Sequence, residues 1–181
     1  MKEVKKKVVL TTAKNEPDFM WLSEVEKLIP WLDGKGADIG CGLRSPLKST
    51  IRVDIDKRVQ PDVLVKGIEL PFKDGELDYI IGIHNFEHHD EQVKVLAEWL
   101  RVLKPGGIVG IVHPDVFYTK KQNPEIDREG LLKNPYNKHW HEHTLQTFEK
   151  QLLKWSHLPF KVVDRGVACP NWSFYYILKK V

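Results

Sequence analysis

A short glycine-containing loop is the first stretch of this sequence whose residue types could do chemistry. The segment GADIGCGLRS begins at Gly36 and places an acid, Asp38, ahead of Gly40 and Gly42. Glycine lets a backbone turn sharply and approach a ligand without a Cβ in the way, and phosphate- and nucleotide-binding loops are built in this manner. The third glycine of the dinucleotide fingerprint is missing, because Arg44 stands close to its place. The loop therefore indicates a bound ligand but departs from the dinucleotide pattern.

Histidines form a second set of residues with chemical potential. His84 and His88 are four residues apart, and His139, His141 and His143 alternate in the segment HWHEH. On an extended chain this alternation puts three imidazoles on one face, and imidazole is the commonest metal ligand in proteins. No matched Cys/His or His-x-x-Glu-His spacing accompanies the cluster. We therefore expect no native metal site, and a His-rich metal-dependent enzyme is kept only as an alternative.

The elements that must position these residues alternate between helix and strand. Hydrophobic periodicity predicts helices at 17–32, 90–103 and 144–156, and strands at 36–40, 51–55, 62–67, 77–83, 108–112, 160–166 and 171–180. Pro46 shortens any helix in LRSPLKST, and KPGG stops the helix before the fifth strand.

This alternation predicts an α/β fold, a single doubly wound, mostly parallel seven-stranded sheet with a reduced first helix. The last two strands are joined by a short Cys-Pro-Asn turn, so they must form a C-terminal antiparallel hairpin. Ligands of such sheets bind beyond the carboxyl ends of the strands. The glycine loop follows one of those ends.

Composition narrows the class of protein. A chain of 181 residues, 41% hydrophobic and 29% charged, is typical of one globular domain. No apolar run approaches the roughly 20 residues that span a bilayer, and the basic start has no signal-peptide pattern. Cys41 and Cys169 are too few for a disulfide framework. We expect a cytoplasmic protein without a membrane partner, and the sequence does not indicate an oligomeric state.

Five segments, taken in order, resemble the class I S-adenosylmethionine-dependent methyltransferases, most of all the small type 11 group. They are DIGCG (38–42), VDID (53–56), ELPFKDGELDYI (69–80), NFEHHDE (85–91) and LRVLKPGG (100–107). The resemblance implies a Rossmann-like methyltransferase fold over a single domain (1–181) and the cofactor S-adenosyl-L-methionine. That cofactor is a nucleoside carrying an amino acid and no phosphate, so the loop does not need a third glycine.

The resemblance assigns the first loop to the methionine part and the ribose edge of the cofactor. Gly40, Cys41 and Gly42 would line this part, and Asp38 would lie near the cofactor ammonium, directly or through water. The alternative is that Asp38 only caps the turn.

The second and third strands would hold the adenosine. Asp54 ends the second strand, where a carboxylate can accept two hydrogen bonds from ribose hydroxyls, and we prefer it to Asp56. Ile55 would then pack on the adenine, and Ile68 and Glu69 would line its other face and edge. The acid that often faces the adenine amino group, two residues before Ile68, is replaced by Lys66. The adenine contacts therefore stay open.

The methionine part and the acceptor involve the histidines. His84 lies at the end of the fourth strand, where the family's backbone meets the methionine part. Methyl transfer is an in-line displacement, and a hydroxyl or amine acceptor needs a base in the range where imidazole titrates. The catalytic candidates are His113, at the end of the fifth strand, and His88. His141 and His143 could reach in from the segment 115–143.

The segment 115–143 is polar, contains two prolines and shows little periodicity, so we interpret it as a lid-like insertion. Its aromatic residues suit a small-molecule acceptor, and residues 1–33 form an N-terminal helical segment. Basic residues are scattered, so we do not expect a nucleic acid partner. Two alternatives stay open. One is a noncatalytic regulator that binds S-adenosylmethionine or S-adenosylhomocysteine. The other is a nicotinamide-dependent enzyme, against which Pro46 and the short link to Asp54 count because they remove most of the first helix.

Overall fold

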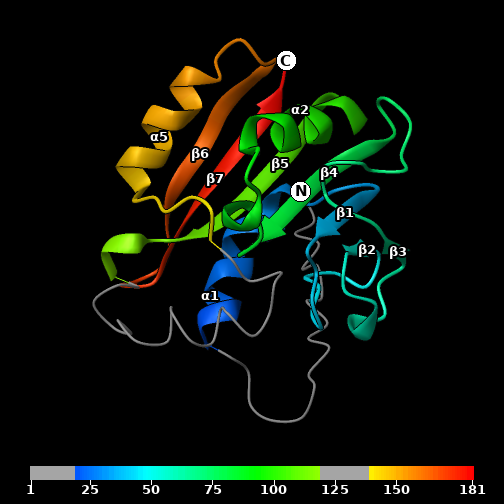
Figure 1. Cartoon of the computed structure of the whole chain (residues 1–181), viewed down its shortest axis with the longest axis horizontal. Coiled ribbons are helices and arrows are strands. Elements are labelled where there is room, and N and C mark those ends of the chain that lie inside the picture. The colour runs from blue at the N-terminus through cyan, green and yellow to red at the C-terminus, as the bar shows by residue number, and fades with distance from the viewer. Residues whose placement is uncertain (1–18, 119–138) are drawn as a thin grey trace, which may run out of the picture.

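The computed structural model describes residues 19–118 and 139–181, which form a layered α/β structure around one sheet (Figure 1). The helices are α1 (Phe19–Leu28), α2 (Gln92–Val102) and α5 (Leu145–Lys154), with 3-10 turns at Ile29–Trp31, Lys57–Val59 and Phe86–His88. The strands are β1 (Gly36–Ile39), β2 (Ile51–Asp54), β3 (Val63–Leu64), β4 (Leu77–Ile83), β5 (Leu103–Pro114), β6 (Phe160–Cys169) and β7 (Ser173–Lys180). In these residues no helix has both the length and the apolar character needed to cross a membrane.

The seven strands of the described sheet lie in the order β3-β2-β1-β4-β5-β7-β6. Neighbouring strands from β3 to β5 are parallel, whereas β7 is antiparallel to both β5 and β6. The connection between β6 and β7 is too short for a parallel crossover, and Asn171 takes a positive φ of 58° within it. The predicted mostly parallel sheet with a C-terminal hairpin is confirmed.

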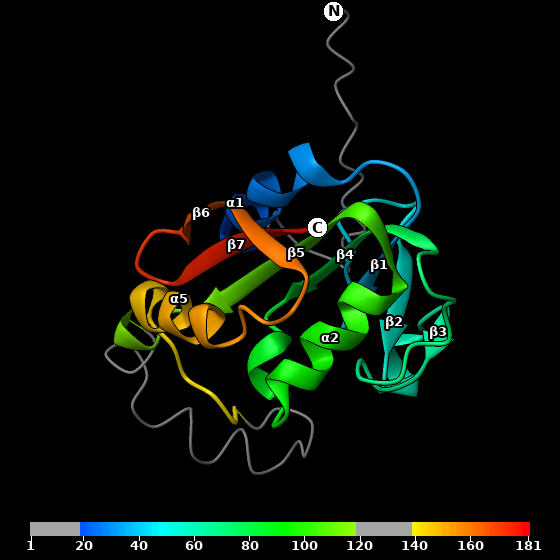
Figure 2. The same cartoon turned by 90° about the horizontal axis from the view of Figure 1, so that it is seen from above.

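Helices cover both faces of the sheet, as predicted, but unevenly. Figure 2 shows α2 and α5 on one face and α1 on the other. The larger core lies under α2 and α5, where Phe86 packs edge-on against Trp99 with ring centroids 5.5 Å apart. The smaller core lies under α1 and includes Leu28, Leu32 and Tyr79. Helical spacing along α1 and α2 places their apolar side chains against the sheet.

The connection from β1 to β2 contains no helix in residues 40–50, so the reduction of the first helix goes further than predicted. Pro46 removes a donor that a helix would need, and the connection consists of turns. Leu47 packs against the smaller core and covers part of the face that a helix would cover. Gly40 and Gly42 therefore lie on a loop at the carboxyl ends of the parallel strands, and this loop leads into turns instead of a helix.

Several strand boundaries differ from the prediction. β3 is shorter than the predicted 62–67, β6 extends three residues beyond the predicted end at 166, and the largest difference is in β5. β5 begins at Leu103 instead of residue 108, because Leu103 pairs with Leu77 while Ile108 pairs with Tyr79. The intervening KPGG segment bulges out of the ladder, with Gly106 at a φ of 79°. Of the predicted insertion at 115–143, only 115–118 and 139–143 lie within the described residues. The domain boundaries stay predictions.

Candidate functional site

A cavity of about 800 Å³ opens where the carboxyl ends of β1, β2 and β4 meet. Its size lies within the roughly 300–1,000 Å³ range of small-molecule sites, and its position is the one expected for parallel sheets. The predicted residues that line it are Gly40, Gly42, Asp54, Ile55, Ile68, Glu69, His84 and His88. The fold thus brings most of the predicted site residues to one cavity.

The loop after β1 is shaped by its two glycines. Gly40 and Gly42 have φ values of 68° and 52°, a region that L-residues other than glycine rarely adopt. A Cβ on Gly40 would lie 2.1 Å from Nδ2 of Asn85, whereas a Cβ on Gly42 would meet no heavy atom of the described residues within 4 Å. Gly40 is therefore required by close packing, and Gly42 leaves open space for a ligand.

Asp54 is held in place by two backbone N–H groups. Its Oδ2 accepts a hydrogen bond from the Gly42 N–H over 2.9 Å, and its Oδ1 accepts one from the Asp56 N–H over 2.8 Å. Each carboxylate oxygen has a further lone pair, so both can still accept hydrogen bonds from a ligand. The Asp56 carboxylate, in contrast, binds the Arg58 Nε over 2.8 Å. This pairing lowers the pKa of Asp56 and favours Asp54 as the ligand contact.

Arg52 joins the glycine loop to the connection after β2. Its Nη2 donates to the carbonyl oxygens of Gly42, over 2.6 Å, and Val59, over 2.8 Å, while its Nη1 donates to that of Gln60 over 3.0 Å. Sequence reasoning missed this residue, although a charge inside a short apolar strand was a usable signal. Arg52 fixes the edge of the cavity without lining it.

The opposite wall, residues 66–70, is fixed by α2. The Leu70 N–H donates to Glu98 Oε1 over 2.8 Å, and the Trp99 Nε1 donates to the Gly67 carbonyl over 3.0 Å. Trp99 is fully buried, and Glu98, the preceding residue of α2, is partly buried. Ile68, Glu69 and the unexpected Lys66 therefore stand on a segment with a defined path.

His84 ends β4 between two buried carboxylates. Its Nε2 lies 2.7 Å from Glu24 Oε1 and its Nδ1 lies 3.8 Å from Glu87 Oε1. Burial alone would lower the pKa of His84, but the two carboxylates outweigh it and raise that pKa to about 10. For the acid Glu87, burial alone would raise the pKa, but the neighbouring His84 outweighs burial and lowers this pKa to about 2. The cavity wall thus contains an imidazolium balanced by two acids.

Glu24 is a site residue that sequence reasoning missed. It lies on α1, is 2% exposed, and also accepts a hydrogen bond from Ser173 Oγ over 2.6 Å. An acid beside Val25 on the apolar stripe of a helix was the available signal. Asn85 and Trp140, which also line the cavity, carried no such signal.

Two predicted cofactor residues, Asp38 and Cys41, lie behind the cavity wall. Both are buried, and burial raises the pKa of Asp38 to about 8 and that of Cys41 to about 12. The Cys41 Sγ donates weakly to the Gly42 carbonyl over 3.5 Å. Their contact with a cofactor stays a prediction.

His113 also lies away from the cavity, in an aromatic cluster. Its ring stacks on Phe174 with centroids 5.1 Å apart and lies 5.4 Å from the ring of His143. Its Nδ1 donates to the Pro114 carbonyl over 2.8 Å, and burial lowers its pKa. His113 is therefore neutral and enclosed, and its predicted role as a base gains no support from this position.

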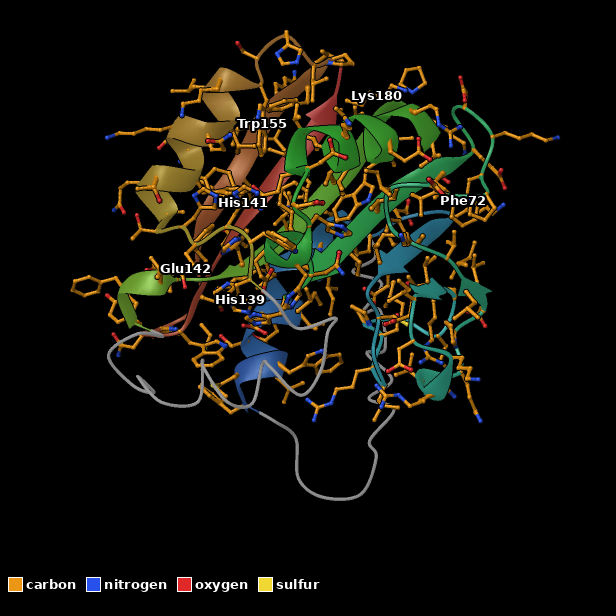
Figure 3. All side chains as sticks on the ribbon, viewed as in Figure 1. Phe72, His139, His141, Glu142, Trp155 and Lys180 are labelled. Atoms are coloured by element: carbon orange, nitrogen blue, oxygen red, sulfur yellow. The ribbon has the colours of Figure 1, made fainter. Side chains whose placement is uncertain are left out.

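The three alternating histidines at 139, 141 and 143 do not form one cluster, because each contacts a different neighbour. The His139 ring packs edge-on against His88 with centroids 4.9 Å apart, and the His141 Nε2 donates to the Asp90 carbonyl over 2.8 Å. His143 packs against His113 instead. Figure 3 shows His139 and His141 on the segment that leads into α5. This segment runs against the connection between β4 and α2, which holds His88.

The cavity wall carries more acids than bases. The acids that line it are Asp54, Asp56, Glu69, Asp90 and Glu91, and Lys66 is the lysine among the lining residues. Asp56 and Glu91 are paired with Arg58 and Lys94 outside the wall. The His84 imidazolium and Lys66 lie on the same wall, so the wall carries charges of both signs.

Comparison with known proteins gives a consistent result. Residues 37–111 match the family model described as "Methyltransferase domain". The chain is 35% identical over 136 residues to "Uncharacterized protein MJ1123" of Methanocaldococcus jannaschii, a match that covers 66% of this chain and 65% of that protein. It is 30% identical over 118 residues to "Probable tRNA methyltransferase 9B" of Mus musculus, covering 56% of this chain and 26% of the mouse protein. The chain thus spans less than two thirds of either relative.

Among solved structures, a similar fold occurs in an S-adenosylmethionine-dependent methyltransferase of Thermotoga maritima, described as a possible histamine N-methyltransferase. The TM-score is 0.64 at 21% sequence identity, and the match covers 88% of each chain. At this identity the likeness concerns the fold.

Proposed function

We propose that this chain, whose residues 37–111 match a methyltransferase domain, is a class I S-adenosylmethionine-dependent methyltransferase that binds S-adenosyl-L-methionine in the cavity and transfers its methyl group to a small-molecule acceptor. One observation carries the proposal. Asp54 stands at the end of β2, lines the cavity, and is held by the backbone N–H of Gly42 from the loop after β1. A fixed carboxylate at this place is suited to a ribose diol.

The cavity wall supports a placement of each part of the cofactor. Asp54 would accept the two ribose hydroxyls, and Ile55 and Ile68 would pack on the adenine from the two sides. The methionine part would extend over Gly42, where the structure leaves open space, toward His84.

The cofactor supplies an activated methyl group on sulfur, and its leaving group is a neutral thioether. The protein then contributes alignment of the acceptor behind that methyl group. His88 lines the cavity and lies four residues after His84, on the 3-10 turn that follows β4. We therefore place the acceptor beside His88. Trp140, at the cavity rim, would cover the acceptor and exclude water.

The acceptor class follows from the cavity more than from relatives. The names of the similar proteins refer to tRNA in one case and to histamine in another, so they do not agree on an acceptor. A cavity of about 800 Å³ has room for the cofactor and a modest second molecule. We therefore propose a small molecule.

The test is a transfer assay with S-adenosylmethionine labelled in the methyl group, run with a panel of small alcohols, phenols and amines and in parallel with total tRNA. We expect label in small molecules, and His88→Ala to reduce turnover at least about tenfold with cofactor affinity kept. Label in tRNA alone would overturn the proposed acceptor class. Cofactor binding without transfer to any acceptor would favour the noncatalytic alternative.

A further inference from the structure

Three potential metal ligands meet beside the cavity. Glu87 and His88 lie on the 3-10 turn after β4, and His139 lies on the segment that leads into α5. One ligand atom from each residue lies within 4.8 Å of those of the other two. Because the Trp140 N–H donates to the Glu87 carbonyl oxygen over 2.9 Å, the two segments are tied together at this point.

Glu87 provides an independent indication of a ligand. The residue is 1% exposed, and its Oε2 is buried without a hydrogen-bond partner among residues 19–118 and 139–181. A buried carboxylate oxygen that is left without a hydrogen-bond partner destabilises the folded chain. A bound cation would remove this destabilisation, and the neighbouring imidazoles are the ligands that such a cation prefers.

We propose that Glu87, His88 and His139 bind a divalent transition-metal ion of the zinc class at the acceptor side of the cavity. Two histidines and one carboxylate form the donor set of catalytic zinc sites, which keep a further position open. Metal–ligand bonds of about 2.0–2.2 Å hold neighbouring ligand atoms roughly 3–3.5 Å apart. Rotation of the His88 and His139 rings, which pack edge-to-face with centroids 4.9 Å apart, would close the remaining gap.

This site differs from the one considered from the sequence, which consisted of His139, His141 and His143. The HWHEH pattern drew attention to three alternating histidines, but His141 donates to the Asp90 carbonyl and His143 packs on His113. Only His139 of that row reaches Glu87 and His88. Because His139 is some fifty residues from its partners, spacing along the chain could not indicate the set.

The use of the ion in catalysis rests on the proposed function. A hydroxyl acceptor would bind the ion through its oxygen, which lowers the pKa of the hydroxyl so that its proton passes to solvent. The oxygen then forms a bond to the methyl carbon, and the carbon–sulfur bond breaks with its electron pair kept on sulfur. The products are the methyl ether, S-adenosylhomocysteine and one proton. His88 would hold the ion instead of taking the proton itself.

The experiment is a metal titration of the chain after treatment with a chelator. Zn²⁺ binding is followed by calorimetry and Co²⁺ binding by visible absorption, for the unaltered chain and for Glu87→Gln, His88→Ala and His139→Ala. His157→Ala, an exposed histidine between α5 and β6, is the matched control. We expect one equivalent bound, and a loss of more than about 100-fold in affinity for the three variants but not for the control, since even outer-shell changes cost 10–100-fold.

Two outcomes would overturn the site: no binding by the unaltered chain, or binding that His139→Ala leaves unchanged. His139→Ala alters a segment outside the sheet, so it keeps the test valid if a change at Glu87 impairs folding. S-Adenosylhomocysteine is titrated separately without metal. That arm tests the cofactor proposal, so a failure of one proposal can be told from a failure of the other.

Discussion

The backbone N–H of Gly42 donates a hydrogen bond to Asp54 Oδ2 over 2.9 Å, and this bond ties the loop after β1 to the end of β2. It orients the carboxylate and leaves the space over Gly42 open. Gly42 can make this bond because glycine readily adopts its positive φ of 52°. The bond in turn orients the carboxylate that we propose to bind the ribose.

The two glycines of the loop differ in what they require. Gly40→Ala adds a Cβ 2.1 Å from Asn85 at a positive φ, so we expect it to lower the free energy of unfolding by about 2–4 kcal/mol. Gly42→Ala bears the backbone strain alone, about 1–2 kcal/mol, but its methyl group enters the cavity. Denaturant unfolding and S-adenosylhomocysteine titration separate the two effects. Equal loss of stability in both variants would contradict this account.

Arg52 does not line the cavity, but we expect it to affect the affinity for the cofactor. Arg52→Lys cannot reach the carbonyl groups of Gly42, Val59 and Gln60 together. We expect cofactor affinity to fall about tenfold, the equivalent of one charged hydrogen bond. The matched control is Arg58→Lys, an exposed residue on the neighbouring turn. Equal affinities for the two variants would show that the clamp does not shape the site.

Glu24 should stabilise the fold through His84. Glu24→Ala leaves the imidazolium with Glu87 alone and removes the acceptor of Ser173, so we expect a loss of about 3–5 kcal/mol at neutral pH. Glu26→Ala changes an exposed acid on the same helix and should alter stability by less than about 0.5 kcal/mol. Thermal unfolding of both variants measures the difference. Similar melting temperatures would mean that the pair contributes nothing.

Asp38 predicts a pH dependence of stability. Burial raises the pKa of Asp38 to about 8, whereas the pKa of an aspartate in an unfolded chain is about 3.9. Between these values the unfolded chain has lost a proton that the folded chain keeps, so stability falls as pH rises, by up to about 1.4 kcal/mol per pH unit. Asp38→Asn removes this slope and should gain stability relative to the unaltered chain from pH 5 to pH 8. Urea unfolding at both pH values provides the check, and a constant difference would refute it.

Much of the fold was predictable because its signals are local. Buried strands read as continuous apolar runs, and the short turn at 170–172 fixed the direction of the last pair. The positions of Gly42 and Asp54 were predictable for the same reason, since both directly follow strands that end at one edge of the sheet. The KPGG bulge was not, because it depends on how β5 aligns with β4.

The parts that escaped prediction depend on contacts between distant segments. Glu24 meets His84 across sixty residues of chain, and His139 meets His88 across fifty-one. His113 was expected to face the site from the end of β5, but its register opposite Phe174 turns it into the aromatic cluster. No periodicity within one element carries such information.

The central claim is that the cavity binds an adenosyl ligand through Asp54, and calorimetric titration with S-adenosylhomocysteine tests it most directly. We predict binding by the unaltered chain, a loss of at least about 100-fold for Asp54→Ala, since two charge-assisted hydrogen bonds are removed, and little change for Asp56→Ala. An unaltered chain that does not bind, or an Asp54→Ala variant that binds equally well, would contradict the account.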